Sequence, residues 1–160
     1  HRLFLDQGFS VTTMDAVTQE AGVSKATVYA HFKSKHELFE TLLRLGSENS
    51  LSLMPPIVRK GGKPRDELFA FFGPFLRHLF EAGAYKWTRM VTAEAERHPE
   101  NAQLFYRCTI ERITSSVEAY FQQLAAENLF PSEQTRRAAE ALVAVVLLGP
   151  MQRVLLLGPG

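Results

Sequence analysis

The segment 24–35 concentrates the side chains that could bind a polyanion. Its twelve residues hold three lysines and one histidine but no aspartate or glutamate. Lysine ammonium groups and the hydroxyls of threonine and tyrosine donate hydrogen bonds to phosphate oxygens, and the same hydroxyls can contact base edges. The segment therefore predicts a local site for nucleic acid.

The charge of the whole chain does not reveal this segment. The 160 residues carry 18 lysines and arginines against 17 aspartates and glutamates, a formal net charge of +1. Residues 1–47 alone are neutral, with five basic and five acidic side chains. This balance excludes a uniformly basic, histone-like surface and an acidic-tail protein. Any contact with nucleic acid must therefore come from a local patch.

Two short helices joined by a tight turn position the segment. Thr13 is placed to cap a helix over 14–21, Gly22 to end it, and Ser24 to cap a second helix over 25–32. This pattern predicts a helix-turn-helix, whose second helix can enter the major groove of DNA. The predicted inner contact of the motif comprises Val17, Ala21, Val23 and Val28.

Further helices are predicted on both sides of this motif. A helix over 2–7 precedes it, and Gly8 closes that helix as a left-handed C-terminal glycine. Ser34 and Glu37 have the Ser-x-x-Glu spacing of a capping box, so a longer helix should start after Ser34 and end before the Pro- and Gly-rich linker 55–64. Its apolar face is predicted to hold Leu38, Leu42 and Leu45.

The motif resembles the DNA-binding signature of TetR-family transcriptional regulators. The matching residues are AGVSKATVYAHFKSKHELF, at 21–39, and the approach Leu3-Phe4-x-x-x-Gly8-Phe9 before Thr12-Thr13. The resemblance implies a helix-turn-helix DNA-binding domain over 1–47, with its first helix cut short, and a helical effector-binding and dimerisation domain over 48–160. Together with the exposed face of the second helix, it predicts DNA contacts by Thr12, Thr13, Ser24, Lys25, Ala26, Thr27, Tyr29, His31 and Lys35.

The rest of the chain is also predicted to be helical, because strand signals are almost absent and the fold class is therefore all-α. The expected helices are 65–82, broken or kinked around Gly73-Pro74, then 85–98, ended by Pro99, then 100–127, and a last one that Ser132 caps and Gly149-Pro150 interrupts. The seam of the longest helix is predicted to be Tyr106, Ile110, Ile113, Val117, Tyr120 and Leu124.

Aromatic residues gather where a ligand wall could form, since five of the 12 phenylalanines lie between Phe69 and Phe80. The resemblance implies an effector site in this body, and the composition favours an apolar or aromatic effector. A plain phenylalanine-rich core is the alternative for any one of these rings. The candidate pocket residues are Phe72, Phe75, Leu76, Leu79, Trp87, Met90, Phe105, Tyr106 and Cys108, with Trp87, Tyr106, Arg89 or His78 as polar handles.

The last helix is too apolar to face water, and the resemblance implies a homodimer built on the C-terminal helices. The candidate interface residues are Ala138, Leu142, Val145, Val146 and Met151. A two-fold dimer would present its recognition helices to successive major grooves of double-stranded operator DNA. We expect the chain to be part of a longer one, with residues missing at both ends and a final helix missing after Leu157.

Several other classes of site are not expected. Glu94 and His98 have the i, i+4 spacing of metal ligands but no third ligand, so a solvated helix face is the simpler interpretation and no metal or cofactor is expected. The single cysteine, Cys108, excludes an intramolecular disulfide and fits a cytoplasmic protein. The longest apolar block, 141–148, is far shorter than the roughly 20 residues that span a bilayer, so no membrane partner is expected.

These features favour a dimeric, ligand-responsive transcriptional regulator, a repressor that a small apolar or aromatic effector releases from its operator. A helical enzyme or lipid carrier is one alternative, but the sequence contains no nucleophile–base pair, phosphate loop or HExxH motif to support it. An interaction protein that uses the apolar last helix is another, and it leaves the lysine-rich helix unexplained.

Overall fold

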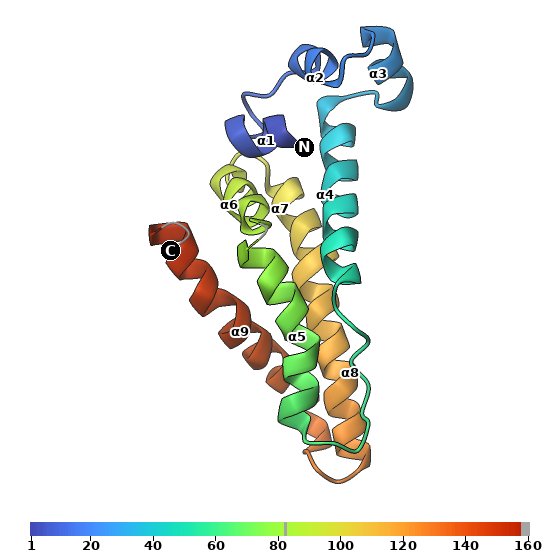
Figure 1. The fold of residues 1–160 in the computed structure, drawn as a ribbon, viewed down its shortest axis with the longest axis vertical. Helices are drawn as coiled ribbons and strands as arrows, with labels where there is room; N and C mark the ends of the chain where they lie inside the picture. The colour runs from blue at the N-terminus through green and yellow to red at the C-terminus, as the bar shows by residue number, and fades with distance from the viewer. Residues whose placement is uncertain (82, 158–160) are drawn as a thin grey trace.

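The computed structural model describes residues 1–81 and 83–157, and all the regular elements in these ranges are helical. The all-α prediction is therefore confirmed. Three short helices form a small unit at one end of the molecule, and the remaining helices form an elongated bundle (Figure 1). The predicted helix end at Ala82 lies outside the described residues.

The elements follow one another along the chain in this order: α1 (Arg2–Gln7), α2 (Met14–Ala21), α3 (Lys25–His31), α4 (Lys35–Ser52), α5 (Pro64–Glu81), α6 (Tyr85–Glu94), α7 (Pro99–Tyr106), a π-helical turn (Arg107–Glu111), α8 (Arg112–Ala126), a 3-10 turn (Ser132–Gln134) and α9 (Thr135–Leu157). The helix α4 crosses the predicted boundary at 47/48 without a break, so that boundary stays a prediction. No helix in the described part is long and apolar enough to cross a bilayer.

Side-chain caps begin the helices of the small unit as predicted. The hydroxyl oxygens of Thr13, Ser24 and Ser34 each accept a hydrogen bond from the backbone N–H three residues further on, at 3.1–3.2 Å. Gly22 ends α2 in the left-handed conformation, with φ +66°. Gly8 also has a positive φ, +84°, but its ψ of 168° lies outside the predicted left-handed helical region.

Some local predictions for this unit are wrong. Of the expected inner contact, Val28 is buried and Val17 half-buried, whereas Ala21 and Val23 are exposed because such short helices leave their corner outside the core. The capping box is only half formed, since Glu37 accepts from the N–H of Lys33 at 2.8 Å.

The buried face of α4 differs from the predicted leucine face. Leu38 is buried as expected, but Leu45 is 51% exposed. The buried positions are Leu38, Phe39, Leu43 and Ser47. Steps of four residues carry this face along α4 because the helix packs along its length against α7 and the π turn.

The long helix contains a π turn, which the regular seam did not predict. The buried side chains are Asn101, Leu104, Thr109, Ile113, Thr114, Val117, Tyr120 and Leu124. The five-residue step from Leu104 to Thr109 is the period of the π turn, and it rotates Tyr106 out to the surface, where it is 55% exposed. The seam prediction is therefore confirmed from Ile113 onward and wrong for Tyr106.

Prolines do not break the helices where breaks were predicted. Both α5 and α9 run through their Gly-Pro pairs, at 73–74 and 149–150. A proline inside a helix removes one hydrogen bond, and the buried residues Phe75 and Met151 that follow these pairs hold the two helices against the core. Pro99 begins α7, and α6 already ends at Glu94.

The predicted cap at Ser132 is also wrong, because a 3-10 turn precedes α9. Ser132 begins this turn. Its hydroxyl donates to the neighbouring Glu133 carboxylate at 3.3 Å and accepts no backbone N–H of a helix. The main chain thus enters α9 through a tighter helical turn.

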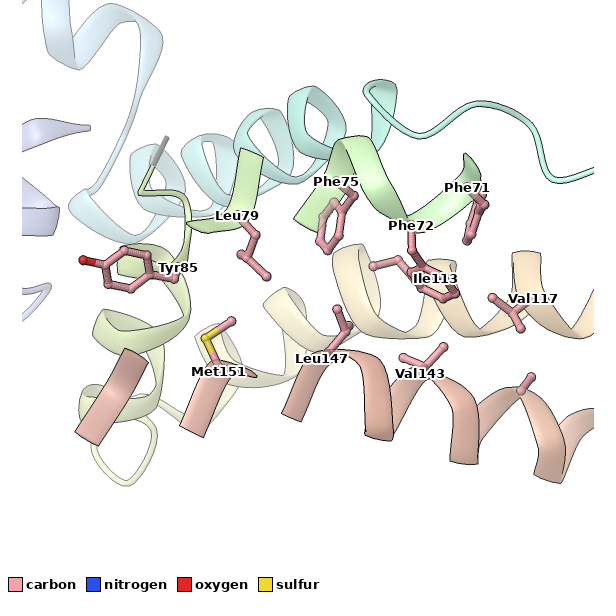
Figure 2. Packing of buried hydrophobic residues seen from close by; sticks show 11 residues of the cluster. Phe71, Phe72, Phe75, Leu79, Tyr85, Ile113, Val117, Val143, Leu147 and Met151 are labelled. Carbon is pink, nitrogen blue, oxygen red and sulfur yellow. The ribbon is translucent and has the colours of Figure 1, made fainter. Parts of the chain in front are cut away.

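Two apolar clusters hold the molecule together. The first lies in the bundle, where α5, α8 and α9 meet around rings and branched side chains that include Phe75, Ile113 and Leu147 (Figure 2). The second joins the small unit to the bundle, because Phe4 and Val28 share it with Met90 and Leu104. The small unit is therefore seated on α4, α6 and α7.

A polar network fastens the linker 53–63 to the far end of the bundle. The Glu67 carboxylate accepts hydrogen bonds from the N–H groups of Lys60 and Gly62, at 2.9 and 3.2 Å, and from the Arg59 guanidinium at 3.0 Å. The Tyr120 hydroxyl donates to the same carboxylate. Tyr120 lies on α8, so the network ties the linker to α5 and α8 together.

Glu67 should make the stability of the fold sensitive to acid. Hydrogen bonds, first from Tyr120 and then from the linker, lower the pKa of Glu67 from 4.5 to about 2. A lowered folded-state pKa adds stability above the unfolded pKa, and this stability is lost as the pH falls from about 4.5 towards 2.

The measurement is urea denaturation between pH 6 and 3. The midpoint of the wild type should fall with pH more steeply than that of Glu67→Gln, while Glu111→Gln, which changes an exposed carboxylate, should follow the wild type. Equal slopes for all three proteins would contradict the role of Glu67.

Candidate nucleic-acid interface and apolar cavity

The helix α3 presents a polar face to solvent. Lys25, Ala26, Thr27, Tyr29 and His31 are exposed, and only Val28 of this helix is buried. The single buried side chain fixes α3 to the rest of the small unit and leaves the predicted contact residues on the outside. A helix seated in this way can lie in the major groove with its N-terminal residues at the base edges.

The Lys25 ammonium is paired within the motif. Its Nζ lies 2.6 Å from Oδ1 of Asp15, in the first turn of α2, and this hydrogen bond raises the pKa of Lys25. Both groups are well exposed, so the pair is weakly held. A phosphate can replace the carboxylate as the partner of Lys25.

Two further predicted residues combine contact with local structure. Ser24 caps α3, and its hydroxyl also shares a hydrogen bond of 2.8 Å with the Thr27 hydroxyl. This pairing orients the Thr27 side chain on the exposed face. Thr13, the cap of α2, is exposed, although Thr12, its neighbour in the sequence, is buried.

Thr12 and Lys35 both make contacts within the small unit. The burial of Thr12 corrects its predicted contact with a phosphate, whereas the predicted contact of the half-exposed Lys35 stays a prediction. Thr12 is 0% exposed, and its hydroxyl donates to the carbonyl oxygen of Gly8 at 2.7 Å. The Lys35 ammonium donates to the carbonyl oxygens of Phe9 and Ser10, at 2.7 and 3.2 Å, and lies 4.5 Å from the centre of the Phe9 ring. Both residues stabilise the α1–α2 loop.

An apolar cavity of about 100 Å³ lies in the bundle. Of the nine predicted pocket residues, four line it: Phe75, Leu79, Trp87 and Phe105. The other lining residues are Leu43, Gly46, Ser47, Ser50, Ala84, Thr88, Thr109, Ile110, Leu147, Leu148 and Met151. The cavity is therefore lined by α4, α5, α6, the long helix and α9, and it is partly open to solvent.

The other five predicted pocket residues do not line this cavity. Phe72 and Leu76 pack in the bundle core, and Met90 belongs to the cluster under the small unit. Tyr106 lines an adjoining apolar groove that shares Phe105, Ile110 and Leu147 with the cavity, whereas Cys108 points elsewhere. Cys108 borders a groove beside Arg44 and Arg107 on another face.

The sequence reasoning missed the walls that α4 and α9 contribute. On α4, the small residues Gly46, Ser47 and Ser50 leave room beside Trp87, whose ring lies 3.9 Å from where a Cβ of Gly46 would be. A cluster of small residues on an otherwise apolar helix face was the available signal. Leu147 and Leu148 of α9 lie in a uniformly apolar stretch of sequence, which does not indicate which of its residues face the cavity.

Few polar groups reach the cavity. Ser47 and Thr109 face each other and share a hydrogen bond of 2.9 Å, and both are buried. His78 reaches the wall only through Ser50, with 3.4 Å between its Nε2 and the hydroxyl. Arg89 borders a separate, more polar groove near α1 and is wrong as a handle for this cavity.

The predicted dimer face on α9 is divided. Val145 is 75% exposed, while Ala138, Leu142 and Val146 are half-buried. Met151 is buried in the bundle core and lines the cavity, so its assignment to a dimer interface is wrong. Its side chain faces inward because it follows Leu147 by four residues on the same face of α9.

The carboxylate of Glu94 takes part in the packing of the small unit, because it accepts hydrogen bonds from Ser10. The prediction that Glu94 belongs to a solvated helix face is therefore wrong. Within residues 1–81 and 83–157, no group of three or more His, Cys, Asp or Glu side chains could hold a metal ion.

Comparison with known proteins gives matches over both parts of the chain. A family model described as bacterial regulatory proteins, tetR family, matches residues 1–42. A second, described as AefR-like transcriptional repressor, C-terminal domain, matches residues 66–159.

Individual relatives and solved structures agree with these matches. The HTH-type transcriptional activator FasR of Mycolicibacterium smegmatis is 34% identical, over 89% of this chain and 63% of its own length. The regulator AcrR of Shigella flexneri is 27% identical, over 84% of this chain and 57% of its own. The solved structure of the flavonoid-responsive regulator FrrA superposes with a TM-score of 0.83, at 29% identity over 99% of this chain and 80% of that one. The chain thus spans about three fifths of the length of FasR and AcrR.

The buried Thr12 hydroxyl gives a prediction about stability. Thr12→Val removes the donor of this part-buried hydrogen bond, so the free energy of unfolding should fall by about 0.5–1.5 kcal/mol. Chemical denaturation measures the loss. Thr92→Val, at an exposed position on α6, should change stability by less than about 0.5 kcal/mol. A Thr12→Val protein as stable as wild type would contradict this role.

Proposed function

The chain belongs to the TetR family of bacterial regulatory proteins, and from this membership we propose that it is a dimeric repressor which a small aromatic effector releases from operator DNA. The observation that carries the proposal is the exposed face of α3, with its hydroxyls and cations on one side of a helix anchored by Val28. The function is thus regulation of transcription in the bacterial cytoplasm and not catalysis.

DNA recognition would depend on α3 and the residues around it. Thr27 and Tyr29 are exposed in the middle of the helix and can contact base edges, while Lys25, Lys33 and His31 can contact phosphates. The exposed Thr13 caps α2, whose free N-terminal amides also favour an anion. Base contacts would give specificity, and phosphate contacts would give affinity.

Dimerisation would use the outer face of α9. Val145 and Leu148 are 75% and 58% exposed and lie three residues apart on this helix, where a partner chain could cover both. A two-fold axis through this face would relate two copies of α3, matching a pseudo-palindromic operator.

The cavity supports a small aromatic effector. Its volume of about 100 Å³ is of the order of an apolar cavity that binds benzene, and its walls are mainly aromatic and aliphatic. The Ser47–Thr109 hydroxyl pair offers one hydrogen bond inside it. FrrA is by its name responsive to flavonoids, which agrees with an aromatic ligand. We therefore propose a single ring with one hydrogen-bonding substituent.

Release would pass through α4. This helix lines the cavity with Ser47 and begins at Lys35, beside the α1–α2 loop. An effector shifts the equilibrium only if it binds one arrangement of α4 more tightly than the other. The C-terminal match to a repressor family favours release, whereas FasR is by its name an activator. A reporter gene behind the bound promoter separates these two outcomes.

The DNA proposal predicts different effects on DNA binding for substitutions at Thr27 and at Lys33. With a duplex selected from a random pool by the full chain, Thr27→Ala should lower specific binding by about 1–3 kcal/mol and leave the salt slope unchanged. Lys33→Ala should weaken binding to all duplexes and reduce the salt slope by about 1.

The matched control is Lys63→Ala, which removes an exposed lysine at the far end of the bundle and should leave DNA binding unchanged. Selection that enriches no sequence over random duplex would overturn the proposed function.

The cavity proposal predicts a preference between two small probes. Phenol should bind about 2- to 10-fold more tightly than toluene, because the hydroxyl pair can partner the phenol OH and one net hydrogen bond is worth about 0.5–1.5 kcal/mol. The fluorescence of Trp87, the only tryptophan, reports binding. The double variant Ser47→Ala/Thr109→Val removes both hydroxyls, so it should abolish the preference and still bind toluene. No binding of either probe would contradict the assignment of the cavity.

A further inference from the structure

A groove between α4 and the long helix collects guanidinium groups, and we call it the arginine groove. Its volume is about 270 Å³, and its lining residues are Arg44, Glu48, Leu104, Arg107, Cys108 and Arg112. None of these residues lines the apolar cavity. Three of the six side chains are positively charged and one is negatively charged, so the groove carries an excess of positive charge.

The π turn brings two of these guanidinium groups to the same side of the long helix. Arg107 and Arg112 are five residues apart, and in an ordinary α-helix they would point about 140° away from each other. The hydrogen bonds of a π turn join residues five apart, so residues at this spacing lie nearly one above the other. The turn Arg107–Glu111 thus places both side chains on the groove.

These two arginines have no carboxylate as a partner. Among the ion pairs of residues 1–81 and 83–157, the guanidinium of Arg44 pairs with Glu40 at 2.8 Å, whereas Arg107 and Arg112 take part in none. Like charges on one face of a helix repel each other and destabilise it. An anion bound between Arg107 and Arg112 would remove this repulsion.

The side chains around the groove define the chemistry of its ligand. A guanidinium group donates parallel hydrogen bonds to two oxygens of a phosphate or a carboxylate. Two such groups match the several oxygens of one phosphate, or two carboxylates of one small acid. Leu104 is buried and Cys108 is half-buried, so an anion held by the arginines would also cover the thiol.

We propose that the arginine groove is a binding site for a small oxyanion, a phosphate or a compact polycarboxylate, held between Arg107 and Arg112. The site is separate from the proposed operator contacts, because Arg44 lies nine residues, or about 14 Å, beyond the start of α4 at Lys35. The inference therefore goes beyond the proposed function and does not depend on it.

The test uses the reactivity of Cys108, the only cysteine of the chain. Dithiodipyridine, an uncharged disulfide reagent, forms a mixed disulfide with the thiol and does not itself compete for the arginines. Inorganic phosphate and citrate are added separately to the full chain, with the ionic strength held constant by sodium chloride. At least one of the two anions should slow the reaction about threefold or more, and the effect should saturate as the site fills.

Matched variants separate a site from a general effect of charge. Arg112→Gln removes one of the two guanidinium groups and should abolish the protection of Cys108. Arg137→Gln makes the same change of charge at an exposed position on α9, outside the groove, and should retain it. Equal protection in these two variants would overturn the proposal.

A second measurement does not need the thiol. At about ten times its half-saturating concentration, the bound anion should raise the melting temperature of the wild type and of Cys108→Ser by about 3–5 °C. The shift for Arg112→Gln should be less than about 1 °C. The absence of both protection and stabilisation would contradict the site. Protection by a random DNA duplex, but by neither small anion, would make the groove a nucleic-acid contact and would also overturn the proposal.

Discussion

The packing of Phe39 is the interaction on which the rest of the structure depends. This residue of α4 is 0% exposed, and its ring lies 5.0 Å from Phe4, 4.7 Å from Phe9 and 6.2 Å from Trp87, measured between ring centres. These partners lie on α1, the α1–α2 loop and α6, so one ring joins the DNA-binding unit to two walls of the cavity. Aromatic contacts of this kind combine a large buried area with defined geometry. A shift of the small unit relative to the bundle therefore requires the rings of this cluster to repack.

The π turn is the second constraint, and it explains where sequence reasoning succeeded. After the turn, the spacing of Ile113, Val117 and Tyr120 follows the ordinary helical period, and the seam was predicted correctly. Before it, the same period pointed to Tyr106, which is exposed. A π turn depends on how the long helix packs between its neighbours, and no local sequence pattern predicts it. Its consequence is the inward orientation of Thr109, which supplies half of the hydroxyl pair in the cavity.

The candidate DNA face was predictable because it depends on local chemistry. The caps Thr13 and Ser24 and the turn at Gly22 are set by neighbours in the sequence, and the structure has them where the sequence predicts. The roles of Thr12 and Lys35 were not predictable, since both depend on where the carbonyl oxygens of the α1–α2 loop lie in space. The cavity was half predictable, because its aromatic wall is visible in the composition and its α4 wall is made by small residues whose effect appears only beside Trp87.

Polar contacts hold α4 at both of its ends. At its N-terminus, Lys35 holds the carbonyl oxygens of the α1–α2 loop. After its C-terminus, the linker is fastened by Arg59, whose guanidinium donates to Glu67 and Glu127 at 3.0 and 2.9 Å. Between these points, Ser47 faces the cavity and has no long side chain to absorb a change in volume. In the proposed function, a group bound in the cavity would tilt the whole helix or move α6. The polar contacts at the two ends of α4 would then convert a local change in packing into a movement of the small unit.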